Sequence, residues 1–234
     1  IIMTEAFQFK QFTIRHDRCA MKVGTDGVLL GAWANAKGKQ RILDIGTGSG
    51  LIALMLAQRT DAMITGIEID PASATQAQEN AAASPWADRL QIVATDIAGY
   101  TSYQAFDLIV SNPPFFNEML LPPDAARSQA RHTQALTFEA LLFHVQRLLS
   151  PEGSFCAILP ATALTHFSSA AAAQALFVVH TTFVHTTMRK APKRVLVELR
   201  KEVSPIVEDS FVLTGADGRR SRAYEDLTKD YYVR

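Results

Sequence analysis

The sequence predicts an α/β protein whose core is a doubly wound, mostly parallel sheet of seven strands with an antiparallel C-terminal hairpin. Two observations carry this prediction. Between Arg41 and about Arg200, short runs rich in β-branched residues alternate with longer segments of helical spacing. The last two β patterns lie close enough in sequence to pair as a hairpin at the edge of the sheet.

The expected elements follow the chain in order. Strands are expected at residues 41–45, 63–69, 90–94, 106–111, 154–160, 176–186 and 193–200. Helices are expected at residues 50–59, 72–82, 137–149 and about 162–175, and upstream residues 25–34 also have helical spacing, whereas residues 7–14 alternate like a strand. We expect residues 1–40 to form an N-terminal extension, 41–203 the core, and 204–234 a C-terminal extension of the same domain.

Composition limits the class of protein. The chain has 234 residues, of which 48% are hydrophobic, enough for one core. No apolar run reaches the roughly 20 residues of a membrane helix, and no secretory signal is seen. Cys19 and Cys156 stand far apart, without the spacing of a metal site. A globular, cytoplasmic protein without a metal ion is therefore expected.

Charge is unevenly distributed although the chain has 23 basic and 23 acidic residues. Residues 1–40 carry 6 basic and 3 acidic side chains, residues 41–184 carry 6 and 12, and residues 185–234 carry 11 and 8. Two basic ends around an acidic middle give weak support for a polyanionic partner.

A glycine-rich turn follows the first strand of the core. In the run from Leu43 to Gly50, we take Asp44, Gly46, Thr47, Gly48 and Gly50 as candidates for ligand binding. Glycines there let the backbone turn tightly and approach a ligand, and the helix that follows offers free N–H groups.

Acidic residues follow the next two strands. Glu68, with Ile69 beside it, lies where a nucleoside-binding fold places an acid on the ribose hydroxyls, and Asp96 lies at the same sheet edge with Ile97 able to cover a ring. These acids could instead be helix caps and loop residues, but their position at successive strand ends favours a ligand. A nicotinamide dinucleotide and S-adenosylmethionine both fit, so these residues leave redox and methyl-transfer chemistry open.

The fourth strand ends in an unusual corner, Asn112-Pro113-Pro114-Phe115. The Asn112 side-chain oxygen and the Pro113 carbonyl are two acceptors that can hold the hydrogens of an exocyclic amine and favour its reactive form in the transition state. The prolines make the corner stiff, and Phe115 can stack on a planar base. A turn with exposed prolines is the simpler interpretation, but it leaves the neighbouring glycine turn unexplained.

These motifs resemble a known class. The Asp-x-Gly-x-Gly-x-Gly pattern with an acid after the second strand is similar to class I S-adenosylmethionine-dependent methyltransferases. The corner resembles the Asn/Asp/Ser-Pro-Pro-Tyr/Phe signature of enzymes that methylate adenine N6, cytosine N4, guanine N2 or the glutamine side chain. The resemblance implies S-adenosyl-L-methionine as cofactor. The corner contains no cysteine nucleophile, as cytosine C5 methylation would need.

Two further segments resemble one family within that class. His16–Ala34 and the tail Leu227–Val233 look like the terminal segments of bacterial tRNA1(Val) adenine-N6 methyltransferases, and "ARHT" at 130–133 fits the loop after the corner. The resemblance implies methylation of the adenine just 3′ of the anticodon of a valine tRNA. It also implies that the segment containing Lys22, Thr25, Asp26 and Gly27 closes over the methionine end of the cofactor. Many members have Tyr where this chain has Phe115.

A tRNA substrate would need basic side chains for its backbone, and its target base must be turned out of the stack. The candidates are Arg15, Arg18, Arg127, Arg131, Arg189, Lys190, Lys193, Arg194, Arg219, Arg220 and Arg222, with Lys22 as a further possible phosphate contact. Each alone is more often a solvated surface charge.

Three alternatives stay open at this point. Methylation of guanine N2 or of a protein glutamine would use the same chemistry. A binding module without catalysis has no reason to keep both the glycine turn and the corner. A redox enzyme leaves the corner unexplained.

Overall fold

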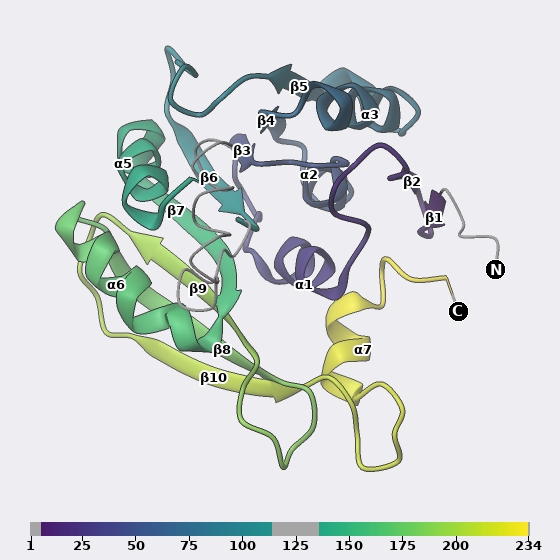
Figure 1. Cartoon of the computed structure of the whole chain (residues 1–234), viewed down its shortest axis with the longest axis vertical. Helices are drawn as coiled ribbons and strands as arrows, with labels where there is room; N and C mark the ends of the chain where they lie inside the picture. Colours follow the sequence, from purple (N-terminus) through teal and green to yellow (C-terminus); the bar gives the residue numbers. More distant parts are fainter. Residues whose placement is uncertain (1–5, 114–135, 234) are drawn as a thin grey trace, which may run out of the picture.

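A computed structural model describes residues 6–113 and 136–233 of the chain. Its main sheet has eight strands in the described residues, in the spatial order β10-β8-β9-β7-β6-β3-β4-β5 (Figure 1). The strands are β3 (Arg41–Ile45), β4 (Met63–Glu68), β5 (Leu90–Ala94), β6 (Phe106–Ser111), β7 (Leu149–Pro160), β8 (Phe177–His185), β9 (Arg194–Arg200) and β10 (Val207–Val212).

The sheet confirms the expected fold class and adds one strand. Strands β5, β4, β3, β6 and β7 pair in parallel, and β9 runs antiparallel to both β7 and β8. The expected hairpin is therefore present, but it is not the edge of the sheet. The prediction of seven strands was one short, because β10 from the C-terminal extension pairs in parallel with β8.

Helices cover both faces of the sheet (Figure 1). The helices are α1 (Thr25–Trp33), α2 (Leu51–Ala57), α3 (Pro71–Ala82), α5 (Phe138–Leu148), α6 (Leu164–Ala173) and α7 (Arg222–Thr228). Alternate residues of each strand face opposite layers. In β3, Ile42 packs with residues of α1 and α2, whereas Leu43 packs with residues of α5 and α6. Both faces are buried, which explains the near-continuous apolar strands.

The first described strands and the last described residues lie side by side (Figure 1). The expected single strand at residues 7–14 is instead two short strands, β1 (Ala6–Gln8) and β2 (Thr13–Arg15), which pair with each other. Phe9 then forms a β-bridge with Tyr232 near the C-terminus. We call Phe7, Phe9, Phe12, Tyr231 and Tyr232 the terminal cluster.

Candidate active site

The glycine turn lies at the carboxyl edge of the sheet, between β3 and α2. Gly46, Gly48 and Gly50 have φ angles of 71°, 56° and 83°, which side chains rarely adopt. The amides of Gly46 and Thr47 donate to the Ile67 carbonyl at 2.9 and 3.0 Å and so hold the turn against β4. A Cβ atom added at Gly46 or Gly48 would meet no other atom within 4 Å, so the space in front of the turn is open to a ligand.

Asp44 supports this turn from behind. Its side chain is fully buried, and its Oδ2 accepts a hydrogen bond of 2.6 Å from the Thr47 hydroxyl. Burial raises the pKa of Asp44 to about 7. Thr47 and Gly48 face the cavity described below, whereas Asp44 does not line it. Asp44 therefore acts on any ligand through the shape of the turn.

Glu68 ends β4 next to the same turn. Its two carboxylate oxygens accept hydrogen bonds from the amides of Gly48 at 2.9 Å and Asp70 at 3.0 Å. Each oxygen keeps capacity for a further donor, such as a ribose hydroxyl. The adjacent Ile69 is 60% exposed, an apolar surface beside the acid. This pair fits the expected position of a nucleoside.

Asp96 and Ile97 follow β5 in a turn. The Asp96 carboxylate accepts a hydrogen bond of 3.0 Å from the Ala98 amide. Ile97 is only 4% exposed and packs in the core beneath the turn. Core packing alone accounts for Ile97, and its contact with a ring stays a prediction.

The corner begins at the end of β6, beside β3. The Ser111 hydroxyl donates to the Ile45 carbonyl at 2.9 Å and holds the two strand ends together. The next residue, Asn112, has its Oδ1 atom buried with no hydrogen-bond partner among the described residues. Such an atom costs free energy until a donor reaches it. Pro113 is buried, and Pro114 and Phe115 lie outside the described residues.

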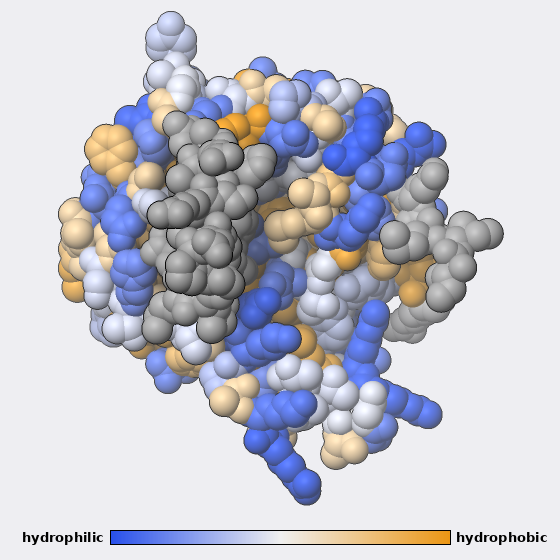
Figure 2. All heavy atoms as spheres, viewed as in Figure 1, coloured by the Kyte–Doolittle hydropathy of each residue, from blue (hydrophilic) through white to orange (hydrophobic). Residues whose placement is uncertain are grey.

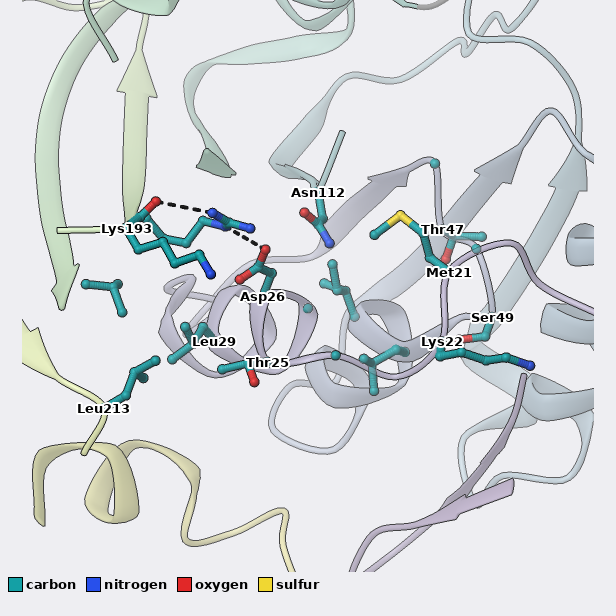
Figure 3. Close-up of a pocket in the computed structure, with 18 of the residues that line it drawn as sticks. Met21, Lys22, Thr25, Asp26, Leu29, Thr47, Ser49, Asn112, Lys193 and Leu213 are labelled. Carbon is teal, nitrogen blue, oxygen red and sulfur yellow. Dashed lines mark hydrogen bonds and ion pairs between the residues drawn. The ribbon is translucent and has the colours of Figure 1, made fainter. Parts of the chain in front are cut away.

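One cavity of about 460 Å³ connects the glycine turn with Asn112, whereas the expected cofactor residues Asp44, Gly50, Glu68, Ile69, Asp96 and Ile97 do not line it. In Figure 3, Asn112 lies between Thr47 of the glycine turn and the side chain of Asp26. The cavity is lined by Met21, Lys22, Gly24, Thr25, Asp26, Gly27, Leu29, Gly46, Thr47, Gly48, Ser49, Leu51, Ile52, Asn112, Val184, Thr186, Lys193, Arg194 and Leu213. It therefore joins some of the expected cofactor residues, those of the segment before and within α1, of the glycine turn and of the corner, to the hairpin of β8 and β9.

The segment before and within α1 forms one wall. Lys22 Nζ donates to the His16 carbonyl at 3.1 Å, and Asp26 accepts a hydrogen bond of 2.7 Å from Arg194 Nε. A Cβ atom added at Gly27 would lie 3.0 Å from Leu51, so this glycine lets α1 approach α2 closely. Asp26 and Arg194, expected on cofactor and RNA respectively, are thus partners of one another within the cavity wall.

The other expected RNA contacts lie in three places. Arg15 and Arg18 are near α3, where Arg18 forms an ion pair with Glu79. Arg189, Lys190 and Lys193 lie between β8 and β9. Arg219, Arg220 and Arg222 lie at the start of α7 or just before it, and Arg127 and Arg131 lie outside the described residues.

Two arginines of the last group already have protein partners. Arg220 stacks over the ring of Tyr232 at 4.2 Å, and Arg222 lies 3.7 Å from Asp226. Neither contact was expected from the sequence.

Sequence reasoning missed much of the apolar lining. Leu29, Val184 and Leu213 come from three separate elements and meet only in the folded chain. Met21 and Ser49 are direct neighbours of expected residues in the segment around Lys22 and in the glycine turn. Their position next to these motifs is the one sequence signal that could have pointed to them. Within residues 6–113 and 136–233, no group of three potential metal ligands is found and no helix is long and apolar enough to cross a membrane.

Comparisons with known proteins agree with this geometry. The family model "Methyltransferase small domain" matches residues 21–160. A predicted O-methyltransferase of Agrobacterium tumefaciens has a similar fold, with a TM-score of 0.68 at 17% identity over 88% of this chain and 96% of that one. A glycopeptide N-methyltransferase in complex with S-adenosyl-L-methionine has a TM-score of 0.57 at 13% identity over 76% and 99%. The fold is that of a Rossmann-like methyltransferase.

Sequence relatives define the family more narrowly. The tRNA1(Val) (adenine(37)-N6)-methyltransferase of Phocaeicola vulgatus is 48% identical over 97% of each chain. Proteins with the same name from Bacteroides thetaiotaomicron and Dickeya chrysanthemi are 48% and 46% identical over 97% and 99% of this chain, and over 97% and 96% of their own. This chain belongs to the tRNA1(Val) (adenine(37)-N6)-methyltransferase family.

Proposed function

We propose that this protein transfers a methyl group from S-adenosyl-L-methionine to N6 of adenine 37, next to the anticodon of a valine tRNA. The observation that carries the proposal is the buried, unpartnered Asn112 Oδ1 in a cavity that also contains the glycine turn. Relatives named for this reaction match nearly the whole chain. With tRNA as substrate, the activity belongs in the cytoplasm.

The cavity residues fit the methyl donor. The open space in front of Gly46 and Gly48 would hold part of the donor against the backbone of the glycine turn. Glu68 does not line the cavity, but it lies beside this turn and has acceptor capacity for the ribose hydroxyls. Met21 and Thr25 would cover the opposite side from the α1 wall. When bound, the donor supplies an electrophilic methyl group.

Asn112 would act on the amine. Adenine N6 is a weak nucleophile because its lone pair is delocalised into the ring. The Asn112 oxygen would accept a hydrogen bond from N6, with the Pro113 carbonyl as a second acceptor, and so favour the form whose lone pair is free. Asp26 provides the one carboxylate in the described lining, and it is paired with Arg194. Catalysis would therefore rest on positioning and hydrogen bonding, without a covalent intermediate.

A labelled methyl-transfer assay tests the proposal. The protein is incubated with unmodified valine tRNA and methyl-labelled donor, and the RNA is digested to nucleosides. We expect the label to migrate with N6-methyladenosine. Label in 2-methylguanosine, or on a protein glutamine, would contradict the proposal and support one of the alternative amines.

A further inference from the structure

Two loops rich in basic residues leave the sheet side by side. The hairpin loop (186–194) follows β8 and ends on the first residue of β9, and the tail loop (213–222) follows β10 and ends on the first residue of α7. The two segments stay hydrogen-bonded to each other beyond the ends of β8 and β10. The Leu213 amide donates to the His185 carbonyl at 2.8 Å, and the Thr214 amide donates to the Thr186 carbonyl at 3.0 Å. The extra strand β10 therefore brings together two segments that are separate in sequence.

Positive charge is concentrated on these loops. The hairpin loop has four basic residues and no acid, and the tail loop has three basic residues and Asp217, so together they carry a net charge of +6. Because the whole chain has a net charge of zero, the rest carries −6. Figure 2 shows hydrophilic side chains projecting from the part of the molecule where Figure 1 places these loops.

Several of these cations are available to a partner. Arg189, Lys190, Lys193 and Arg219 are exposed and form no ion pair with any residue in the described ranges. Asp217, the one acid in the two loops, accepts a hydrogen bond of 3.0 Å from the Arg219 amide.

The two loops contribute to the wall of the candidate active site. Thr186 and Lys193 of the hairpin loop and Leu213 of the tail loop line the same cavity as Asn112. By contrast, Arg15 lines a separate groove beside α3 that shares no lining residue with this cavity. A polyanion with one unit inserted at Asn112 would therefore lie within reach of the two loops.

We propose that the hairpin loop and the tail loop together bind the phosphate backbone of the anticodon stem-loop while its target base enters the cavity. This inference rests on the proposed function. Phosphate contacts fix the position of a nucleic acid, and each one adds to the salt dependence of binding. The surface joins two of the expected basic groups and leaves out the group near α3.

Two charge-matched double variants test the surface. Arg189→Ala/Lys190→Ala removes two cations from the hairpin loop. Lys37→Ala/Lys39→Ala removes two from the segment before β3, at the amino edge of the sheet and so opposite the loops. Affinity for a valine tRNA transcript is measured over a series of salt concentrations, and donor binding is measured by calorimetry to show that each variant is folded.

We expect the loop variant to bind the tRNA about tenfold more weakly at low salt, with the salt slope smaller by about 2. Adding Arg219→Ala should weaken binding by a further factor of about three. The control variant and all donor affinities should stay within about twofold of wild type.

Equal tRNA binding by the two double variants, whether both unchanged or both weakened, would contradict the proposal that the two loops bind the RNA backbone. Methylation by the wild-type protein separates this result from a failure of the proposed function. If wild type makes N6-methyladenosine while the loop variant binds like the control, the function stands and the surface is wrong. If wild type does not methylate the tRNA, the proposed function itself fails.

Discussion

The carboxyl edge of the sheet and the terminal cluster differ in how they use polar atoms. At the sheet edge, Asn112 Oδ1 is buried without a partner among the described residues, and two glycines face open space. In the terminal cluster, the Tyr231 hydroxyl donates to the Met55 carbonyl at 3.1 Å, and the hydroxyls of Tyr224 and Tyr232 lie 3.0 Å apart. A binding site keeps unpaired acceptors and free volume, whereas a packing motif satisfies its polar groups and fills space.

This difference changes the meaning of the C-terminal motif. Leu227–Val233 resembles a family signature and could be taken for part of the substrate site. In the structure Tyr231 is buried and Tyr232 bridges to Phe9, and the rings of Phe9 and Phe12 stack with centroids 4.6 Å apart. Packing between the chain ends accounts for the motif. Conversely, similarity to a family does not by itself separate catalytic residues from structural ones.

The largest expected effect is on stability, from a change in the terminal cluster. Phe9 is fully buried, so Phe9→Ala should lower the free energy of unfolding by about 4 kcal/mol. Denaturant unfolding measures this loss. Methyl transfer by the folded variant, well below its unfolding transition, should match wild type. Loss of donor binding in the folded variant would show that the cluster also shapes the site.

The next effect is on the reaction and belongs to the sheet edge. Asn112→Ala should lower the rate of methyl transfer about 10²- to 10³-fold, because an acceptor that acts in the transition state is lost. Donor affinity should change little. Ser111→Ala is the neighbouring control: it removes the bond to Ile45, which should cost about 1 kcal/mol of stability and leave the rate near wild type. Parallel loss of rate and donor affinity in Asn112→Ala would make Asn112 a structural residue.

A smaller effect depends on pH. The pKa of Asp44 is raised from 3.8 to about 7, so the fold favours the neutral acid while the unfolded chain is ionised above its own pKa. This contribution to stability is complete at low pH and is lost as the pH rises through about 7. Between about pH 5 and pH 8, wild type should lose about 3 kcal/mol relative to Asp44→Asn, measured by denaturant unfolding. A constant difference between the two proteins would mean that Asp44 is ionised in the fold.

The smallest effect separates strain from ligand contact. Gly48 and Gly38 both have positive φ angles, 56° and 75°, and a Cβ atom added at either would meet no other atom within 4 Å, but only Gly48 faces the cavity. Alanine at either position should cost about 1 kcal/mol of stability. Only Gly48→Ala should also weaken donor binding, by about tenfold, since its methyl group would project into the space in front of the turn. Equal donor binding by the two variants would place the donor elsewhere.

Much of the core could be predicted because its signals are local. The limits of β3, β5 and β6 match the apolar runs expected at residues 41–45, 90–94 and 106–111. Strand β10 was missed because its residues are largely exposed and include Glu208 and Asp209, so it lacks the pattern of a buried strand.

The lining of the cavity was predicted where its residues belong to a local motif, as at Gly48 and Asn112. It was not predicted where residues meet only through the fold. The Asp26–Arg194 ion pair joins positions 168 residues apart, and Arg220 stacks on Tyr232 because the chain after β10 returns toward the terminal cluster through α7. No local spacing indicates either contact.

A pair of valine tRNA transcripts tests the central claim most directly. One transcript has adenine at position 37 and the other has guanine there, with every other nucleotide unchanged. The account predicts that wild-type protein transfers labelled methyl groups to the first transcript, in a fragment that contains nucleotide 37, and not to the second. Equal labelling of both transcripts would contradict it, because the methylated position would then lie elsewhere in the RNA.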